Sequence, residues 1–212
     1  MTLTRIIAAR TNAQVTCVVV HGRAQTQDDM VQAIVAHLDL PQVRFVLPKS
    51  DGQGWYGARA IDPLTDICRA ELAASLSALD AVMADATAQG HPVLLAGFSQ
   101  GACLAVEYLM TRGPVPQAAA LLTGCRVGVR ADTLPSVDLG GLPIYATGGD
   151  ADPWIPADAC LEMLGDLTCA GARIRMDMFP GRPHSVAKAE VAVMRGMLDD
   201  LTHGRGLFGG SA

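Results

Sequence analysis

The chain of 212 residues has the length of one folded domain, and half of its residues are apolar, which excludes an intrinsically disordered protein. A net charge of −5 without a run of lysine or arginine offers nothing to nucleic-acid phosphates or anionic lipids, so we expect no nucleic-acid partner. No apolar run approaches the roughly 20 residues that span a bilayer, and the first residues lack the apolar stretch of a signal peptide. We therefore predict a cytoplasmic protein without integral membrane contact.

The six cysteines are scattered through apolar patterns, with no C-x-x-C pair and no histidine at metal-ligand spacing. This distribution predicts small buried thiols in a reducing compartment and no metal site. The cysteines are Cys17, Cys68, Cys103, Cys125, Cys160 and Cys169.

Short apolar runs rich in β-branched residues alternate with longer segments of helical period along the chain. Such alternation is typical of an α/β fold, in which helices cover both faces of a mostly parallel sheet. The predicted strands are residues 15–20, 43–47, 93–98, 118–123, 142–147 and 173–179, with a candidate edge strand within residues 2–9.

The predicted helices lie between these strands and after the last one. Thr26 and Asp29 resemble a capping box ahead of the first helix. Gly90 ends the second helix, Gly113 ends the third, and Pro156 opens the fourth. The apolar faces of four helices are Met30, Ile34, Val35 and Leu38; Leu72, Leu76, Leu79 and Met83; Leu104, Tyr108 and Leu109; and Val191, Met194 and Leu198.

We expect a single domain over residues 1–202, because no interdomain linker or internal repeat interrupts the pattern. The glycine-rich residues 203–212 are expected to form a flexible C-terminal tail.

Residues 48–63, PKSDGQGWYGARAIDP, form an irregular segment directly after a predicted strand. Long irregular segments are often functional loops, and ligands bind α/β sheets beyond the carboxyl ends of the strands. Trp55 and Tyr56 either line a substrate cleft there or attach the loop to the body of the domain.

The segment Gly97-Phe98-Ser99-Gln100-Gly101 stands where a strand pattern gives way to a helical one, which is the context of a nucleophile elbow. The turn is so tight that the residues two before and two after the serine must be small. It also forces the serine into a sparsely populated backbone conformation. Ser99 is therefore the candidate nucleophile, at a helix N-terminus that favours an oxyanion.

A serine hydroxyl needs a base within hydrogen-bond reach and an acid that orients this base. Only His184 and His203 follow Ser99, and His184 comes directly after the last predicted strand, so His184 is the candidate base. Asp150 and Asp152 both follow the strand at 142–147, and either carboxylate can serve on sequence grounds. The proline after Asp152 mildly favours that residue.

Two backbone N–H donors must also stabilise the tetrahedral intermediate. We expect them to be those of Gln100 and Arg23, because the segment His21-Gly22-Arg23 ends a strong strand and glycine lets the backbone turn there. His21 precedes the nucleophile and is expected to brace this loop.

The segments HGRAQTQDDM, GFSQGA, GDADPWIP and PGRPHS together resemble the phospholipase/carboxylesterase family of α/β-hydrolases, which includes acyl-protein thioesterases. The resemblance covers most of the chain and implies an α/β-hydrolase fold with a minimal lid or none. In that family the acid is the aspartate before proline, which implies a triad of Ser99, Asp152 and His184. The resemblance further implies no cofactor, a homodimer in many members, and cleavage of short to medium acyl esters, lysophospholipids or thioesters.

Two segments depart from the family pattern. HGRAQ has Ala24 where the family loop carries a glycine beside the oxyanion donor, and LTGCRVG places Cys125 and Arg126 near the expected cleft mouth. Arg126 either attracts an acidic substrate group or is solvated. The large side chains expected at a modest acyl pocket are Trp55, Tyr56, Phe98 and Trp154.

The sequence thus predicts a serine carboxylic-ester hydrolase that acts on a small-molecule ester or thioester through an acyl-enzyme. Two alternatives remain: a hydrolase of one specific metabolite such as a lactone, and a non-catalytic binding protein with a hydrolase fold. Dienelactone hydrolases use cysteine as nucleophile, so Ser99 disfavours that example, and the full set of triad residues disfavours the binding protein.

Overall fold

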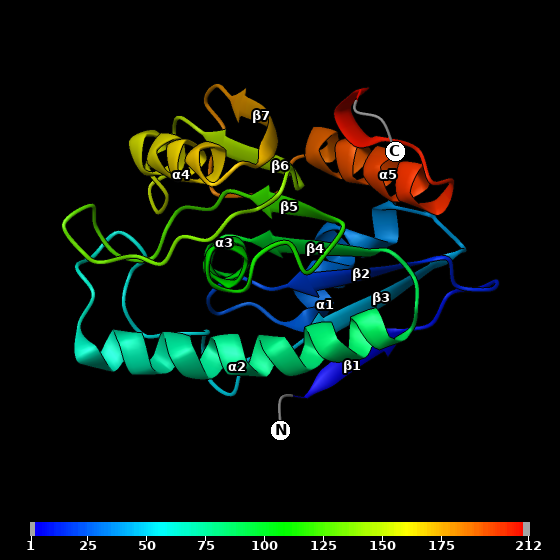
Figure 1. The fold of residues 1–212 in the computed structure, drawn as a ribbon, viewed down its shortest axis with the longest axis horizontal. Helices are drawn as coiled ribbons and strands as arrows, with labels where there is room; N and C mark the ends of the chain where they lie inside the picture. Colours follow the sequence, from blue (N-terminus) through cyan, green and yellow to red (C-terminus); the bar gives the residue numbers. More distant parts are fainter. Residues whose placement is uncertain (1–2, 210–212) are drawn as a thin grey trace.

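The computed structural model describes residues 3–209, which form a seven-stranded sheet of order β1-β3-β2-β4-β5-β6-β7, covered by helices (Figure 1). The strands from β2 to β7 pair in parallel, and the edge strand β1 pairs antiparallel with β3. The predicted mostly parallel sheet is confirmed, and the candidate edge strand forms. The strands are β1 Thr4–Ile7, β2 Val15–Val20, β3 Val43–Pro48, β4 Val93–Phe98, β5 Ala118–Leu122, β6 Pro143–Gly149 and β7 Arg173–Phe179.

Helices cover both faces of the sheet, as an α/β fold requires. Apolar residues of α2, α3 and α4 form one core layer, and those of α1 and α5 form the other (Figure 1). The α-helices are α1 Gln27–Ala33, α2 Asp66–Ala88, α3 Gln100–Arg112, α4 Ala157–Cys169 and α5 Lys188–Thr202, and two short 3₁₀ helices are η1 Val35–His37 and η2 Leu207–Gly209. Within residues 3–209, no helix combines the length and apolar character that crossing a membrane needs.

The central strands are mostly apolar because both of their faces are buried, although β2 includes the buried polar residue Thr16. In β2, Val18 packs into the layer of α2, α3 and α4, while its neighbours Cys17 and Val19 pack into the layer of α1 and α5. Successive side chains of a strand point to opposite faces, so a parallel strand between two helical layers needs a nearly continuous apolar run. The run VTCVVV therefore forms a central strand.

Some boundaries differ from the sequence prediction for local reasons. The capping box of Thr26 and Asp29 forms, but α1 ends at Ala33 because the backbone of Ile34 leaves the helical region, and η1 follows. Strand β5 ends at Leu122, one residue early, because Thr123 has a positive φ of 56°.

The expected flexible tail is only in part within the described residues. Leu207 is 4% exposed, its side chain belongs to the layer of α1 and α5, and its carbonyl accepts a hydrogen bond from Arg173. Leu207 thus attaches the segment 203–209 to the domain by an apolar contact. The high glycine content of the segment had led us to expect a flexible tail. Residues 210–212 lie outside the described part of the chain.

Candidate active site

The loops that follow β2, β4, β6 and β7 carry the candidate catalytic and oxyanion-hole residues, and these loops lie at the carboxyl edge of the sheet. Between β4 and α3, Ser99 has φ 54° and ψ −123°, a sparsely populated conformation for a residue with a side chain. A Cβ atom on Gly97 would overlap the backbone of Gly101, and one on Gly101 would overlap the carbonyl of Val20. Both glycines are therefore required by this elbow, as the motif predicts.

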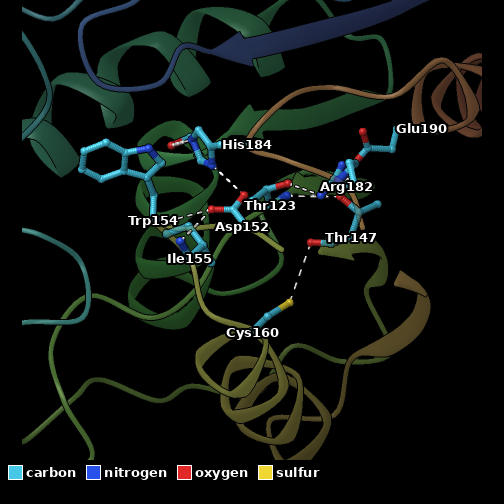
Figure 2. A network of polar contacts seen from close by, with 10 residues as sticks. Thr123, Thr147, Asp152, Trp154, Ile155, Cys160, Arg182, His184 and Glu190 are labelled. Atoms are coloured by element: carbon cyan, nitrogen blue, oxygen red, sulfur yellow. Dashed lines mark hydrogen bonds and ion pairs between the residues drawn. The ribbon is translucent and has the colours of Figure 1, made fainter. Parts of the chain in front are cut away.

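Three side chains from distant loops meet at this elbow. His184 Nε2 lies 2.8 Å from Ser99 Oγ, and His184 Nδ1 lies 2.7 Å from Asp152 Oδ2. The Asp152 side chain is fully buried, and its Oδ1 accepts the backbone N–H groups of Trp154 at 2.8 Å and Ile155 at 3.0 Å (Figure 2). A carboxylate only accepts hydrogen bonds, so we assign the proton of the imidazole to Nδ1, and Nε2 then faces Ser99 Oγ as an acceptor.

The other candidates for acid and base lie elsewhere. Asp150 is exposed and its Oδ1 accepts the N–H of Gly181 at 2.5 Å, so it supports the loop that carries His184 without touching the ring. His203 follows α5, where its Nδ1 lies 2.7 Å from the carbonyl of Asp199. The residues alone left open whether Asp150 or Asp152 contacts the candidate base. In the structure, the carboxylate of Asp152 faces the His184 ring and that of Asp150 does not.

The two residues expected to supply the oxyanion donors, Arg23 and Gln100, line the same cavity as Ser99. Among the described residues, neither the N–H of Arg23 nor that of Gln100 makes a backbone or side-chain hydrogen bond. A Cβ atom on Gly22 would stand 3.2 Å from Ser99 Cβ, so the loop after β2 lies directly against Ser99. Ala24, which replaces the family glycine, adopts the left-handed conformation with φ 55°, and its N–H is bonded to the carbonyl of Gln53.

His21 braces the loops around the site. Its Nδ1 lies 2.7 Å from the carbonyl of Gly22, and its Nε2 accepts the N–H of Ser50 at 3.1 Å. Trp55 Nε1 donates to the His21 carbonyl at 2.7 Å, and the two rings lie 4.9 Å apart. Burial lowers the pKa of the His21 imidazole, which therefore stays neutral and holds this arrangement.

Ser99 and His184 open onto a cavity of about 310 Å³. Tyr56 and Trp154 line it, and Trp154, 58% exposed, stands at its mouth. Two other predicted pocket residues do not line this cavity. Trp55 attaches the irregular loop to the body through the contact with His21, and Phe98 packs against the His184 ring at 5.0 Å. Sequence reasoning missed Arg59, Ala60, Cys103 and Ile155, which also line the cavity.

Arg126 is neither a cleft cation nor solvated, so both interpretations were wrong. Its Nε lies 2.8 Å from Glu107 Oε1 and its Nη1 lies 2.9 Å from Asp166 Oδ2, with only 7% of the side chain exposed. Arg126 lies four residues after the end of β5, and the two carboxylates that neutralise it come from α3 and α4. Cys125, also buried, lies with its sulfur 3.8 Å from that of Cys103.

A buried polar network attaches the loop that carries His184 to the body of the domain (Figure 2). Arg182 contacts Glu190 Oε1 through Nη1 and Thr123 Oγ1 through Nη2, each at 2.5 Å. Thr147 donates its hydroxyl to the same Glu190 oxygen. The sequence analysis did not predict this network. Its one sequence signal is Arg182, a charged residue two positions before His184. Among residues 3–209, no cluster of three or more histidine, cysteine or acidic side chains could hold a metal ion.

Comparisons with known proteins identify the family and the fold. A family model described as Phospholipase/Carboxylesterase matches residues 1–201. The chain belongs to this family. No curated protein matches the chain.

Several solved structures are also similar to this member of the phospholipase/carboxylesterase family. A phospholipase/carboxylesterase from Dyadobacter fermentans DSM 18053 is 25% identical, with a TM-score of 0.79 over 93% of this chain and 95% of that one. The carboxylesterase of Bacillus cereus is 16% identical, with a TM-score of 0.77 over 95% of both chains, and shows the shared fold. Arabidopsis thaliana SOBER1 is 16% identical, with a TM-score of 0.75 over 89% of this chain and 99% of that one, and likewise shows the fold. The α/β-hydrolase fold is thus confirmed, and the family is one of ester hydrolases.

Proposed function

We propose that the protein is a serine carboxylesterase in which Ser99 is the nucleophile, His184 the general base and Asp152 the orienting acid. The observation that carries the proposal is the continuous pair of hydrogen bonds from Asp152 through His184 to Ser99, at 2.7 and 2.8 Å. Such a chain of nucleophile, base and orienting group is the arrangement that activates a serine hydroxyl at neutral pH.

In the first half of the reaction, Ser99 Oγ forms a bond to the carbonyl carbon of the ester while its proton passes to His184 Nε2. The carbonyl oxygen becomes an oxyanion, and the free N–H groups of Arg23 and Gln100 are the donors we assign to it. The intermediate collapses with cleavage of the bond to the leaving alcohol or thiol, which receives the proton from His184. An acyl-Ser99 ester remains.

In the second half, a water molecule gives a proton to His184 Nε2 and its oxygen attacks the acyl carbon. The new tetrahedral intermediate expels Ser99 Oγ, which regains the proton from His184, and a carboxylic acid is released. The balance needs only ester and water, so no cofactor takes part. A cavity of about 310 Å³ supports short to medium acyl groups in esters, lysophospholipids or thioesters.

Two accompanying proposals concern the state of the protein in the cell. All six cysteines are free, which supports a reducing and hence cytoplasmic location. A homodimer is proposed on the family resemblance, and sedimentation velocity tests it.

The test is hydrolysis of 4-nitrophenyl esters from acetate to octanoate by the wild type and by Ser99→Ala, Asp152→Asn and the matched control Asp150→Asn. We expect kcat to fall by at least about 10³-fold in the first two variants, because they remove the nucleophile and the orientation of the base. Asp150→Asn should stay within about tenfold, since that carboxylate contacts only the Gly181 backbone. Full activity in Ser99→Ala would refute the mechanism.

Labelling by a serine-directed phosphonate separates the alternatives if the wild type hydrolyses none of these esters. Labelling at Ser99 would then favour a hydrolase of one specific metabolite such as a lactone. Absence of labelling would favour a non-catalytic binding protein.

A further inference from the structure

The cavity beside Ser99 is lined by two arginines, Arg23 and Arg59. Among the described residues that line it, none is an aspartate or glutamate. The cavity therefore carries a local positive charge within a chain whose net charge is −5. A cleft lined by one sign of charge concentrates ligands of the opposite sign.

The two arginines differ in what they contact. Arg23 Nη1 donates to the carbonyl of Gly57 at 2.8 Å, Nη2 donates to that of Ala58, and the guanidinium lies 6.0 Å from the ring centre of Tyr56. Arg23 thus ties the loop after β2 to the irregular segment. The side chain of Arg59 makes no hydrogen bond, ion pair or ring contact with any residue that the structure describes.

Arg59 is one of three described arginines whose guanidinium contacts no carboxylate or carbonyl, and the other two, Arg130 and Arg195, do not line this cavity. Most of the others contact a carboxylate, including the exposed Arg112 with Asp80 and the buried Arg126 with Glu107. Arg59 has an acidic neighbour in the chain, Asp62, but that carboxylate accepts the backbone N–H of Arg59 at 3.3 Å and forms no ion pair with its side chain. The donors of Arg59 are therefore available to a ligand in the cavity.

We propose that the substrate is an ester that carries a carboxylate, and that Arg59 binds this carboxylate while Ser99 attacks the ester carbonyl. The inference rests on the proposed function and adds the class of substrate, of which the monoesters of short dicarboxylic acids are the simplest. A planar guanidinium with five N–H donors matches a carboxylate in a bidentate geometry, which a neutral acyl chain cannot use. The apolar part of the acyl chain contacts Tyr56, Ala60 and Ile155, which line the same cavity.

The experiment compares matched pairs of methyl esters by the acid they release in a pH-stat: monomethyl succinate, glutarate and adipate against methyl butanoate, pentanoate and hexanoate. A second arm puts the charge on the leaving group, with 4-acetoxybenzoate against 4-methylphenyl acetate. Each pair is measured with the wild type, with Arg59→Gln and with the control Arg130→Gln, an exposed arginine that does not line this cavity.

In at least one arm, we expect the wild type to have the higher kcat/KM for the charged ester. Arg59→Gln should lower the charged-to-neutral ratio by about tenfold, the lower range for a charged hydrogen bond because the site is open to water. The arm that responds identifies the side of the ester that carries the carboxylate. Arg130→Gln should leave the ratio unchanged.

Equal ratios in the wild type and Arg59→Gln in both arms would overturn the inference, and so would an equal loss in Arg130→Gln, which would indicate only the overall charge. Either result leaves the proposed function standing as long as the neutral esters are hydrolysed through Ser99. Failure of the wild type on every ester, charged and neutral, would instead count against the proposed function itself.

Discussion

Replacing Arg182 with methionine should remove a large part of the stability of the domain. Arg182 and Glu190 form an ion pair in which the side chains are 7% and 0% exposed. Without the arginine, the Glu190 carboxylate stays buried with only the Thr147 hydroxyl and the Ala187 N–H as donors. Breaking one side of a buried pair typically costs about 3–5 kcal/mol, so we expect a loss of that size in the free energy of unfolding.

The double variant Arg182→Met/Glu190→Gln tests whether the loss comes from the orphaned carboxylate. Arg182 Nε has no hydrogen-bond partner in the native structure, so the wild type already bears part of the cost of burying this cation. The glutamine still accepts the N–H of Ala187, and no charge is left buried. We therefore expect the double variant to lose less than about 2 kcal/mol, which is less than the single variant.

Urea unfolding followed by tryptophan fluorescence at pH 7 measures these differences, with Arg112→Met as the control. Arg112 pairs with Asp80 at 2.8 Å, but its side chain is 37% exposed, and exposed pairs contribute less than about 1 kcal/mol. A loss below about 1 kcal/mol in Arg182→Met, or a double variant less stable than the single one, would refute the argument.

Three further predictions concern the frame of the site. Gly101→Ala should unfold the protein or lower its free energy of unfolding by at least about 3 kcal/mol, because the added Cβ would overlap the Val20 carbonyl. The control Gly196→Ala has open space in α5, so its free energy of unfolding, measured in urea, should rise by about 0.5–1 kcal/mol. Ala24→Gly should keep or raise the melting temperature, because glycine adopts φ 55° without strain; a clear drop would contradict the strain we infer. Burial lowers the pKa of His21 below its usual 6.5, so on acidification the unfolded chain takes up the proton first. Stability should fall as the pH drops below about 6.5, by at most about 1.4 kcal/mol per unit, and an unaltered pH slope in His21→Gln would argue against this assignment.

The sequence by itself determined the strands and helices because each depends on local chemistry. A strand between two helical layers needs a nearly continuous apolar run, and the runs at β2 and β4 begin and end where the residues predict. The elbow at Ser99 was predictable for the same kind of reason, since the close approach of backbone atoms allows only glycine at the positions two residues away. The order of nucleophile, acid and base along the chain then restricted the remaining candidates.

Tertiary structure alone decided which of several equivalent side chains meet. Asp150 and Asp152 share one turn, yet only Asp152 faces the imidazole, and Tyr56 lines the cavity while its neighbour Trp55 points to His21. From the sequence, Arg126 is expected at the cleft or in solvent. In the structure it is buried and pairs with two carboxylates from helices distant in the chain. Such partners depend on the packing of elements far apart in the chain, whereas composition, periodicity and spacing describe only neighbours along it.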